Sequence, residues 1–169
     1  ELQDIYLFWL SRNFNRAFVK PDYVGILLTK RCNLKCKMCD IRKYPTKPEE
    51  EISFKDVKKV VDDAAWWGIK NMVLSGGEPF LRKDFFEIVD YAVKNMPYVT
   101  INTNLTLMSE EMALKLTELP RNKFHLEISL DGATAATHDS IRGTIGSFDK
   151  IMNNIKLIRE TSKSKHASD

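Results

Sequence analysis

At 169 residues the chain has the length of one domain rather than two. Hydrophobic residues make up 43% and charged residues 29%, as in ordinary soluble globular proteins, and the formal net charge is +3. Because lysines and arginines are interspersed with acids over the chain, the composition gives no reason to expect a nucleic-acid partner, and no apolar run is long enough to span a membrane.

The first predicted element is an amphipathic helix within residues 1–20. Ile5, Phe8 and Trp9 recur at near-helical spacing, and Pro21 ends the pattern. We expect this helix to cover one end of the core. Contact with a membrane surface or with a partner is the alternative.

Four short apolar runs follow, and each precedes a segment with helical periodicity. The predicted strands cover residues 24–29, 72–74, 98–101 and 125–130, and the predicted helices cover 53–67, 84–95, 109–119 and 147–159. Such alternation is typical of parallel strands joined by right-handed helical crossovers, so we expect an α/β fold. Periodicity alone leaves a partial barrel and an open doubly wound sheet as alternatives. At least one of Trp66 and Trp67, at the end of the first of these helices, is expected in the core.

An unusual polar segment follows each predicted strand. The segments are Cys32–Cys39, Ser75–Pro79, Asn102–Asn104 and Ser129–Gly132. In parallel α/β folds, ligand sites form where the carboxyl ends of the strands meet the loops that lead into the helices. We therefore expect the four segments to form one shared site.

The three cysteines Cys32, Cys36 and Cys39 lie within eight residues, with the spacing C-x-x-x-C-x-x-C. An odd, clustered set makes a poor disulfide framework, and free thiols indicate a reducing compartment, so we expect a cytoplasmic protein. Glu1–Asp4 shows no basic region of a secretory signal. Soft thiolates select zinc, copper(I) or iron–sulfur clusters. Three thiolates on a four-iron cubane leave one iron open to a ligand, whereas structural zinc takes four protein ligands.

The cysteine loop resembles that of the radical S-adenosylmethionine (SAM) superfamily throughout Thr29–Cys39. Ser75–Pro79 is similar to the GGEP segment of that family. Ser129–Gly132, together with His138–Gly143, resembles the branch that contains the molybdopterin-precursor cyclase and the SPASM-type peptide-maturing enzymes. The resemblance covers about residues 21–160.

This resemblance implies a [4Fe–4S] cluster on Cys32, Cys36 and Cys39, with SAM bound at the open iron. His138 is expected to be a local hydrogen-bonding residue rather than a base. The remaining site residues follow with their expected roles: Gly76 and Gly77 for close backbone approach to the ligand, Glu78 for the amine of SAM, Pro79 for the turn, Met38 for the adenine, Asn104 for the nucleoside or substrate, Ser129 and Asp131 for the ribose or methionine moiety, and Arg142 for the carboxylate. For Asn104, Ser129, Asp131 and Arg142, ordinary turn, cap or salt-bridge roles remain open.

The implied activity is reductive cleavage of SAM to methionine and a 5′-deoxyadenosyl radical, which abstracts hydrogen from a peptide or small-molecule substrate. The required low potential implies a ferredoxin- or flavodoxin-like electron donor. The implied fold is a partial (β/α) barrel with about four βα units present. We expect an N-terminal helix over 1–20 and a core over 21–169 that is truncated before the fifth and sixth strands. A non-catalytic iron–sulfur module and a zinc-stabilised α/β interaction domain are the alternatives.

Overall fold

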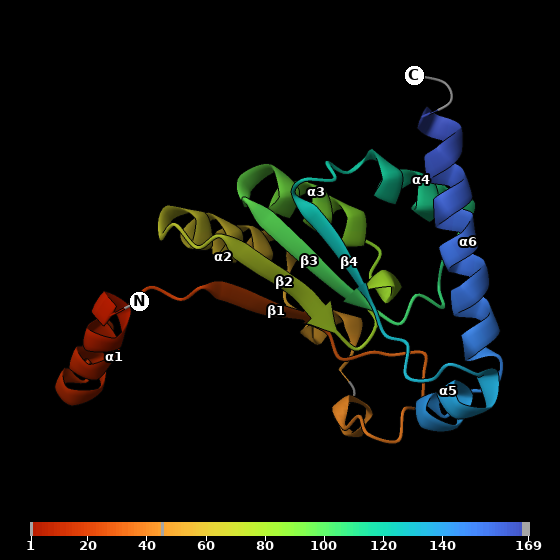
Figure 1. Ribbon diagram of the computed structural model, residues 1–169, viewed down its shortest axis with the longest axis horizontal. Helices are drawn as coiled ribbons and strands as arrows, with labels where there is room; N and C mark the ends of the chain where they lie inside the picture. Colours follow the sequence, from red (N-terminus) through yellow and green to blue (C-terminus); the bar gives the residue numbers. More distant parts are fainter. Residues whose placement is uncertain (1, 45, 167–169) are drawn as a thin grey trace.

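A computed structural model describes residues 2–44 and 46–166, and it is built around a four-stranded parallel sheet (Figure 1). The strands lie in chain order: β1 (Tyr23–Thr29), β2 (Asn71–Gly76), β3 (Tyr98–Thr103) and β4 (Phe124–Ile128). The helices are α1 (Leu2–Phe14), α2 (Phe54–Trp66), α3 (Phe85–Asn95), α4 (Glu110–Glu118), α5 (Ala135–Arg142) and α6 (Ser147–His166). Short 3₁₀ turns cover Ile41–Lys43, Pro48–Glu50 and Pro79–Leu81. Sequential order of parallel strands is the arrangement of a barrel wall, which confirms the partial-barrel prediction.

Side-chain caps fix where the crossover helices begin. The hydroxyl of Ser53 accepts a hydrogen bond from the Asp56 backbone N–H at the start of α2, and Ser109 accepts one from Met112 at the start of α4. These caps satisfy backbone donors that a helix leaves unpaired in its first turn. Both capping serines are the first residues of the helices predicted over 53–67 and 109–119.

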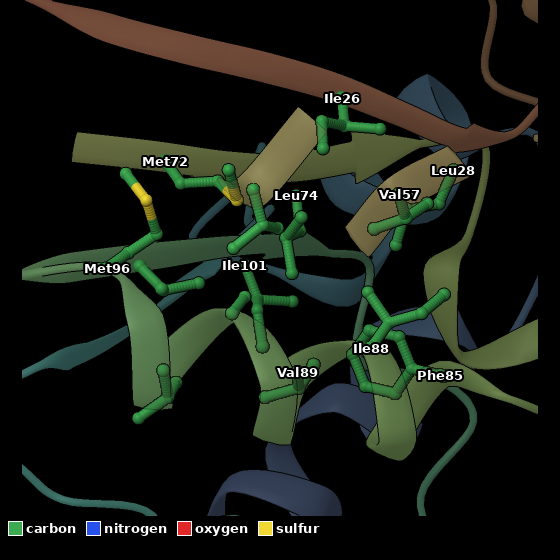
Figure 2. Close-up of a cluster of buried hydrophobic side chains, with 14 of the residues drawn as sticks. Ile26, Leu28, Val57, Met72, Leu74, Phe85, Ile88, Val89, Met96 and Ile101 are labelled. Carbon is green, nitrogen blue, oxygen red and sulfur yellow. The ribbon is translucent and has the colours of Figure 1, made fainter. Parts of the chain in front are cut away.

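The core lies between one face of the sheet and the helices α2 and α3 (Figures 1 and 2). Figure 2 shows the strand residues Ile26, Leu74 and Ile101 facing Ile88 and Val89 of α3. All five are fully or almost fully buried. Strand residues with the opposite alternation face away from these helices.

The other face of β1 remains open in the described structure. Tyr23 and Leu27 alternate with the buried residues of the strand, and they are 65% and 63% exposed. In a (β/α) barrel, the sheet face that points away from the helices is the inner wall, and Tyr23 and Leu27 lie on that face.

The N-terminal helix does not cover the core, contrary to expectation. Figure 1 shows α1 standing apart from the sheet, and Ile5, Phe8 and Trp9 are all more than half exposed. Its apolar residues spread around the helix, and the Tyr6 and Trp9 rings stack on each other at 6.3 Å. In the described structure, no helix is long and apolar enough to cross a membrane.

The prediction that Trp66 or Trp67 enters the core is also wrong. Trp66 is 81% exposed and Trp67 is exposed as well. The buried stripe of α2 ends at Ala64, and the helix ends at Trp66, so the two rings project past the core and pack edge to face at 5.6 Å.

Helix α5 was missed because its sequence lacks a periodic apolar face. His138 is its one buried residue among those described. The helix is fixed by its ends: Thr134 accepts a hydrogen bond from the Thr137 backbone N–H, and Gly143 ends it with a φ of 63°.

Candidate cofactor-binding site

All four polar segments contribute to one pocket of about 240 Å³ at the carboxyl end of the sheet. Its lining residues come from the cysteine loop after β1, the glycine turn Ser75–Gly77 after β2, residues 102–104 at the end of β3, and Ser129 and Arg142 around β4 and α5. The structure thus confirms that the segments meet at one site. A larger hollow of about 630 Å³ between α3 and α4 is lined by none of the cysteines.

The cysteine loop is held against α5 by backbone hydrogen bonds. The Lys35 N–H donates to the Arg142 carbonyl at 3.1 Å, and the Lys37 N–H donates to the Ile141 carbonyl at 2.9 Å. A Cβ at Gly143 would collide with the Lys35 carbonyl, so glycine is needed for this contact. The segment His138–Gly143, which was part of the family resemblance, therefore holds the cysteine loop in place.

The three thiols differ in exposure although all line the pocket. Cys36 is buried, Cys32 is half-buried and Cys39 is exposed. Burial raises the pKa of the Cys32 thiol, and the nearby cysteines act in the same direction. A positive group bound among the thiols would relieve that penalty on their charged form.

Glycine is required at positions 76 and 77 because the backbone before the cysteine loop passes close to both residues. A Cβ at Gly76 would collide with the Thr29 carbonyl oxygen, and a Cβ at Gly77 would collide with that of Arg31. Gly76 also has a φ of 140°, where L side chains are disfavoured. The predicted close approach exists, but its partner in the structure is the backbone that leads into the cysteine loop.

Glu78 does not face the pocket, which corrects the direct ligand contact predicted for its carboxylate. The residue is 0% exposed. Its carboxylate accepts hydrogen bonds from Thr103 Oγ1 at 2.8 Å, Asn104 N at 2.8 Å and Phe80 N at 3.2 Å. Burial raises its pKa, and these three bonds oppose the rise. Glu78 therefore joins the turn after β2 to the end of β3.

Pro79 is buried and begins the 3₁₀ turn Pro79–Leu81, as its predicted turn role requires. Asn104 lines the pocket, but its side chain is already engaged. Its Nδ2 donates to Asn33 Oδ1 at 2.9 Å, and its Oδ1 accepts from the Thr106 N–H at 2.9 Å. The turn-stabilising alternative for Asn104 is the one that the structure shows, and the bond to Asn33 also braces the cysteine loop.

Asn102 belongs to a segment that was expected at the site, but only Asn104 of that segment was predicted to contact the ligand. Asn102 lines the same pocket, and its Oδ1 is buried without a hydrogen-bond donor in the described part of the chain. Such an acceptor has a desolvation cost that a ligand donor would remove. Strand alternation could have identified it, because Ile101 and Thr103 point into the core and Asn102 therefore points to the other face.

The side of the pocket formed by β4 and α5 is held by an ion pair. Arg142 Nε lies 2.5 Å from Asp131 Oδ2, and Arg142 Nη1 donates to Cys36 Sγ at 3.6 Å. Ser129 and Arg142 line the pocket, whereas Asp131 reaches it only through Arg142. The fully buried His138 accepts a hydrogen bond from the Asp131 backbone through Nδ1, as expected of a local structural residue.

Met38 projects at the rim of the pocket and is 59% exposed. Its flexible thioether side chain suits contact with a flat apolar group. The residue lines the pocket next to Cys39, and its adenine role stays a prediction.

The chemistry of the donor set fits an iron–sulfur cluster. Three cysteines line one pocket. Soft thiolates are the ligands of such clusters, and three of them leave one iron of a cubane open to a further ligand.

The sequence profile of the Radical SAM superfamily matches residues 26–167. The chain belongs to the radical SAM superfamily. That match spans every segment that builds the pocket.

Several curated radical SAM relatives are more than 30% identical to the chain. The AdoMet-dependent heme synthase of Methanosarcina barkeri is 35% identical over 140 residues, which are 83% of this chain and 40% of the relative. The subtilosin biosynthesis protein AlbA of Bacillus subtilis is 36% identical over 151 residues, 89% of this chain and 33% of AlbA. The chain thus spans 33% to 40% of the length of these two relatives.

Solved structures confirm the radical SAM fold. Streptococcus suis SuiB bound to its precursor peptide SuiA superimposes with a TM-score of 0.75 at 18% identity, over 95% of this chain and 35% of SuiB. SuiB has also been solved with S-adenosylmethionine bound, with a TM-score of 0.71. The described sheet is therefore part of a radical SAM barrel.

Proposed function

We propose that the full-length protein is a radical SAM enzyme that holds a [4Fe–4S] cluster on Cys32, Cys36 and Cys39 and cleaves S-adenosylmethionine reductively. The observation that carries this proposal is the convergence of the three thiols, the glycine turn and Arg142 on one pocket. When bound, the reduced cluster supplies one electron to the sulfonium of SAM, which yields methionine and a 5′-deoxyadenosyl radical for hydrogen abstraction from the substrate.

The residues of the pocket supply complementary contacts for the parts of SAM. The Arg142 guanidinium is suited to the methionine carboxylate, with Asp131 holding it in orientation. The unpaired Asn102 Oδ1 is suited to a donor such as the amine or a ribose hydroxyl. Met38 offers an apolar surface to the adenine, and Ser129 offers a hydroxyl to the ribose or methionine moiety. In this proposal Gly76, Gly77, Glu78, Pro79 and Asn104 shape the pocket.

The substrate is proposed to bind against the inner wall of the barrel. Tyr23 and Leu27 are exposed on that wall, and Leu27 is the one nearer to the carboxyl end of β1, where the pocket lies. The core over 21–169 would be completed by fifth and sixth βα units in the full-length protein, which close over this surface. Among the relatives, the heme synthase is named for a small molecule and AlbA for a bacteriocin peptide. The resemblance of His138–Gly143 favours a peptide.

A low-potential electron donor of the ferredoxin or flavodoxin type is the proposed partner. Residues 30–47 contain seven lysines and arginines and one acid, although the whole chain has a net charge of only +3. Lys30, Lys35 and Lys37 are exposed around the cysteines. This local excess of positive charge suits a donor with an acidic surface. The free cysteines also support the proposed cytoplasmic location.

The test is anaerobic reconstitution of the full-length protein with iron and sulfide, followed by dithionite and SAM. The proposal predicts brown protein and the formation of 5′-deoxyadenosine and methionine, with both lost in Cys36→Ala. A reconstituted cluster without SAM cleavage would favour the non-catalytic iron–sulfur module. Colourless protein that retains zinc would favour the zinc-stabilised domain.

A further inference from the structure

The carboxylate of Glu51 lies outside the pocket but is bonded to the residues that lead into the cysteine loop. Its side chain is 6% exposed. It accepts a short hydrogen bond from the Thr29 hydroxyl, a bond from Arg31 Nε at 2.7 Å and one from Arg31 Nη2 at 3.2 Å. Arg82 approaches the same carboxylate at 4.0 Å. A buried carboxylate with this many donors holds those donors in fixed positions.

The same two residues carry the glycine turn on their backbones. The Thr29 carbonyl accepts the Gly77 N–H at 2.7 Å, and the Arg31 carbonyl accepts the Glu78 N–H at 2.8 Å. Each residue is therefore bonded to Glu51 through its side chain and to the turn through its carbonyl. Glycine is also required at positions 76 and 77 because these two carbonyls lie so close.

We propose that Glu51 is a positioning residue for the cofactor pocket, acting through Thr29 and Arg31 to set the spacing between the cysteine loop and the glycine turn. We call Glu51, Thr29 and Arg31 the Glu51 clasp. Its effect on SAM binding rests on the proposed function, whereas its effect on the turn does not. The clasp acts at a distance, since Glu51 is absent from the pocket lining.

Asp84 provides a matched control for the clasp. Its carboxylate pairs with Arg82 at 2.6 Å and 2.9 Å, and Arg82 in turn donates to the Leu28 and Ile52 carbonyls. Asp84 thus belongs to the same charged cluster as Glu51 but is bonded to Arg82 rather than to Thr29 or Arg31 in the described structure. If Glu51 acted only on overall stability, the two carboxylates would behave alike.

The first test is amide hydrogen exchange on the full-length protein without cofactor, comparing wild type, Glu51→Gln and Asp84→Asn. The clasp predicts that Glu51→Gln accelerates exchange at the Gly77 and Glu78 amides by about tenfold, because a neutral amide replaces a charge-assisted acceptor. Asp84→Asn should leave both amides within about twofold of wild type. Unchanged exchange in Glu51→Gln, or equal acceleration in both variants, overturns the proposal.

The isosteric variant Thr29→Val keeps the test decisive if Glu51→Gln does not fold. Valine removes the hydroxyl contact with Glu51 and the bond that the same hydroxyl accepts from the Arg31 N–H, so it breaks the side-chain links of the clasp at Thr29 and leaves the carbonyl in place. Faster exchange at Gly77 than in wild type, by about threefold, supports the clasp. Exchange at the wild-type rate contradicts it.

The second test measures SAM affinity of reconstituted protein with matched iron content. Glu51→Gln and Arg31→Gln should each raise the dissociation constant of SAM by about tenfold. The double variant should have a dissociation constant no higher than that of the single variant that binds SAM less tightly, because both substitutions remove the same interaction. Additive losses, or an affinity unchanged by Glu51→Gln, overturn the clasp. If the wild-type protein holds no cluster or binds no SAM, the proposed function fails, and the exchange experiment still decides the clasp.

Discussion

The two halves of the cofactor pocket are held in different ways. The half formed by the cysteine loop, the glycine turn and the end of β3 belongs to the core: Glu78 and Thr103 are buried and bonded to each other. The half formed by β4 and α5 is joined to the cysteine loop by two backbone hydrogen bonds and carries the ion pair of Arg142 and Asp131, whose side chains are 12% and 28% exposed. None of the residues of β4 is buried, whereas each of the other three strands has buried residues. The first half is therefore held by buried side-chain contacts, and the second by backbone contacts and a partly exposed ion pair.

The largest effect is expected in the first half, at Gly77→Ala. The new methyl group collides with the Arg31 carbonyl, so the free energy of unfolding should fall by about 3 kcal/mol, the upper range for overpacking. Gly25→Ala on β1 is the control, because a Cβ there meets nothing within 4 Å. Denaturant titration measures both. Equal stability of the two variants would mean that the turn is not held against the cysteine loop.

Glu78→Gln tests the buried link between the turn and β3. Gln presents an NH₂ group to at least one of the donors that now meet a carboxylate, so the free energy of unfolding should fall by about 2 kcal/mol. Glu127→Gln on β4, an exposed position, is the matched control and should change it by less than about 0.5 kcal/mol. If Glu78→Gln left the free energy of unfolding unchanged, these hydrogen bonds would not stabilise the first half.

Arg142→Met tests the half formed by β4 and α5. The variant should raise the dissociation constant of SAM by about tenfold, since it removes a charge-assisted contact. The free energy of unfolding should fall by less than about 1 kcal/mol, because the ion pair with Asp131 is partly exposed. Isothermal titration of the reconstituted protein measures the first value, with Arg159→Met as control. A SAM affinity equal to that of the wild type would show that Arg142 does not contact SAM.

Acid should lower the free energy of unfolding through Asp84 and Glu51, and only Glu51 acts on the glycine turn. Hydrogen bonds from Arg82 lower the pKa of Asp84. Burial alone would raise the pKa of Glu51, but bonds from Arg31 and Thr29 outweigh it and lower the value. The folded-state pKa values lie below the unfolded ones, so this stabilisation is present above about pH 4 and is lost as the pH falls through the folded values.

Unfolding curves measured from pH 6 downward check this dependence. Asp84→Asn should flatten the acid branch relative to wild type, because the variant lacks the titrating carboxylate. A wild-type curve without loss of stability below pH 4 would contradict the assigned pKa directions.

The smallest effect is expected outside both halves, at Trp66→Ser. The ring is 81% exposed, so its removal should change the free energy of unfolding by less than about 0.5 kcal/mol. Thermal unfolding of the variant checks this. A clear loss of stability would show that Trp66 packs against part of the full-length protein.

The sequence was informative wherever a local pattern determines structure. Strand and helix alternation predicted the sheet, and the serines at 53 and 109 predicted two helix starts. The cysteine spacing and the polar strand ends predicted which segments meet. These features depend on nearest neighbours or on the general topology of parallel folds.

Contacts between distant segments could not be predicted in the same way. Two partners of Glu78, Thr103 and Asn104, are about 25 residues away at the end of β3, and the partners Thr29 and Arg31 precede Glu51 by about 20 residues. Which carboxylate faces a ligand and which joins two loops depends on the path of the backbone. Asn102 was recoverable from strand alternation, whereas the exposure of Trp66 depends on where α2 ends.

The most direct test of the central claim is electron–nuclear double resonance on the reduced, reconstituted full-length protein with SAM labelled with ¹⁵N at its amine. The account predicts a hyperfine coupling between the cluster and this nitrogen, because three cysteines leave one iron free to bind it. A complete [4Fe–4S] signal without that coupling, at saturating SAM, would contradict the account.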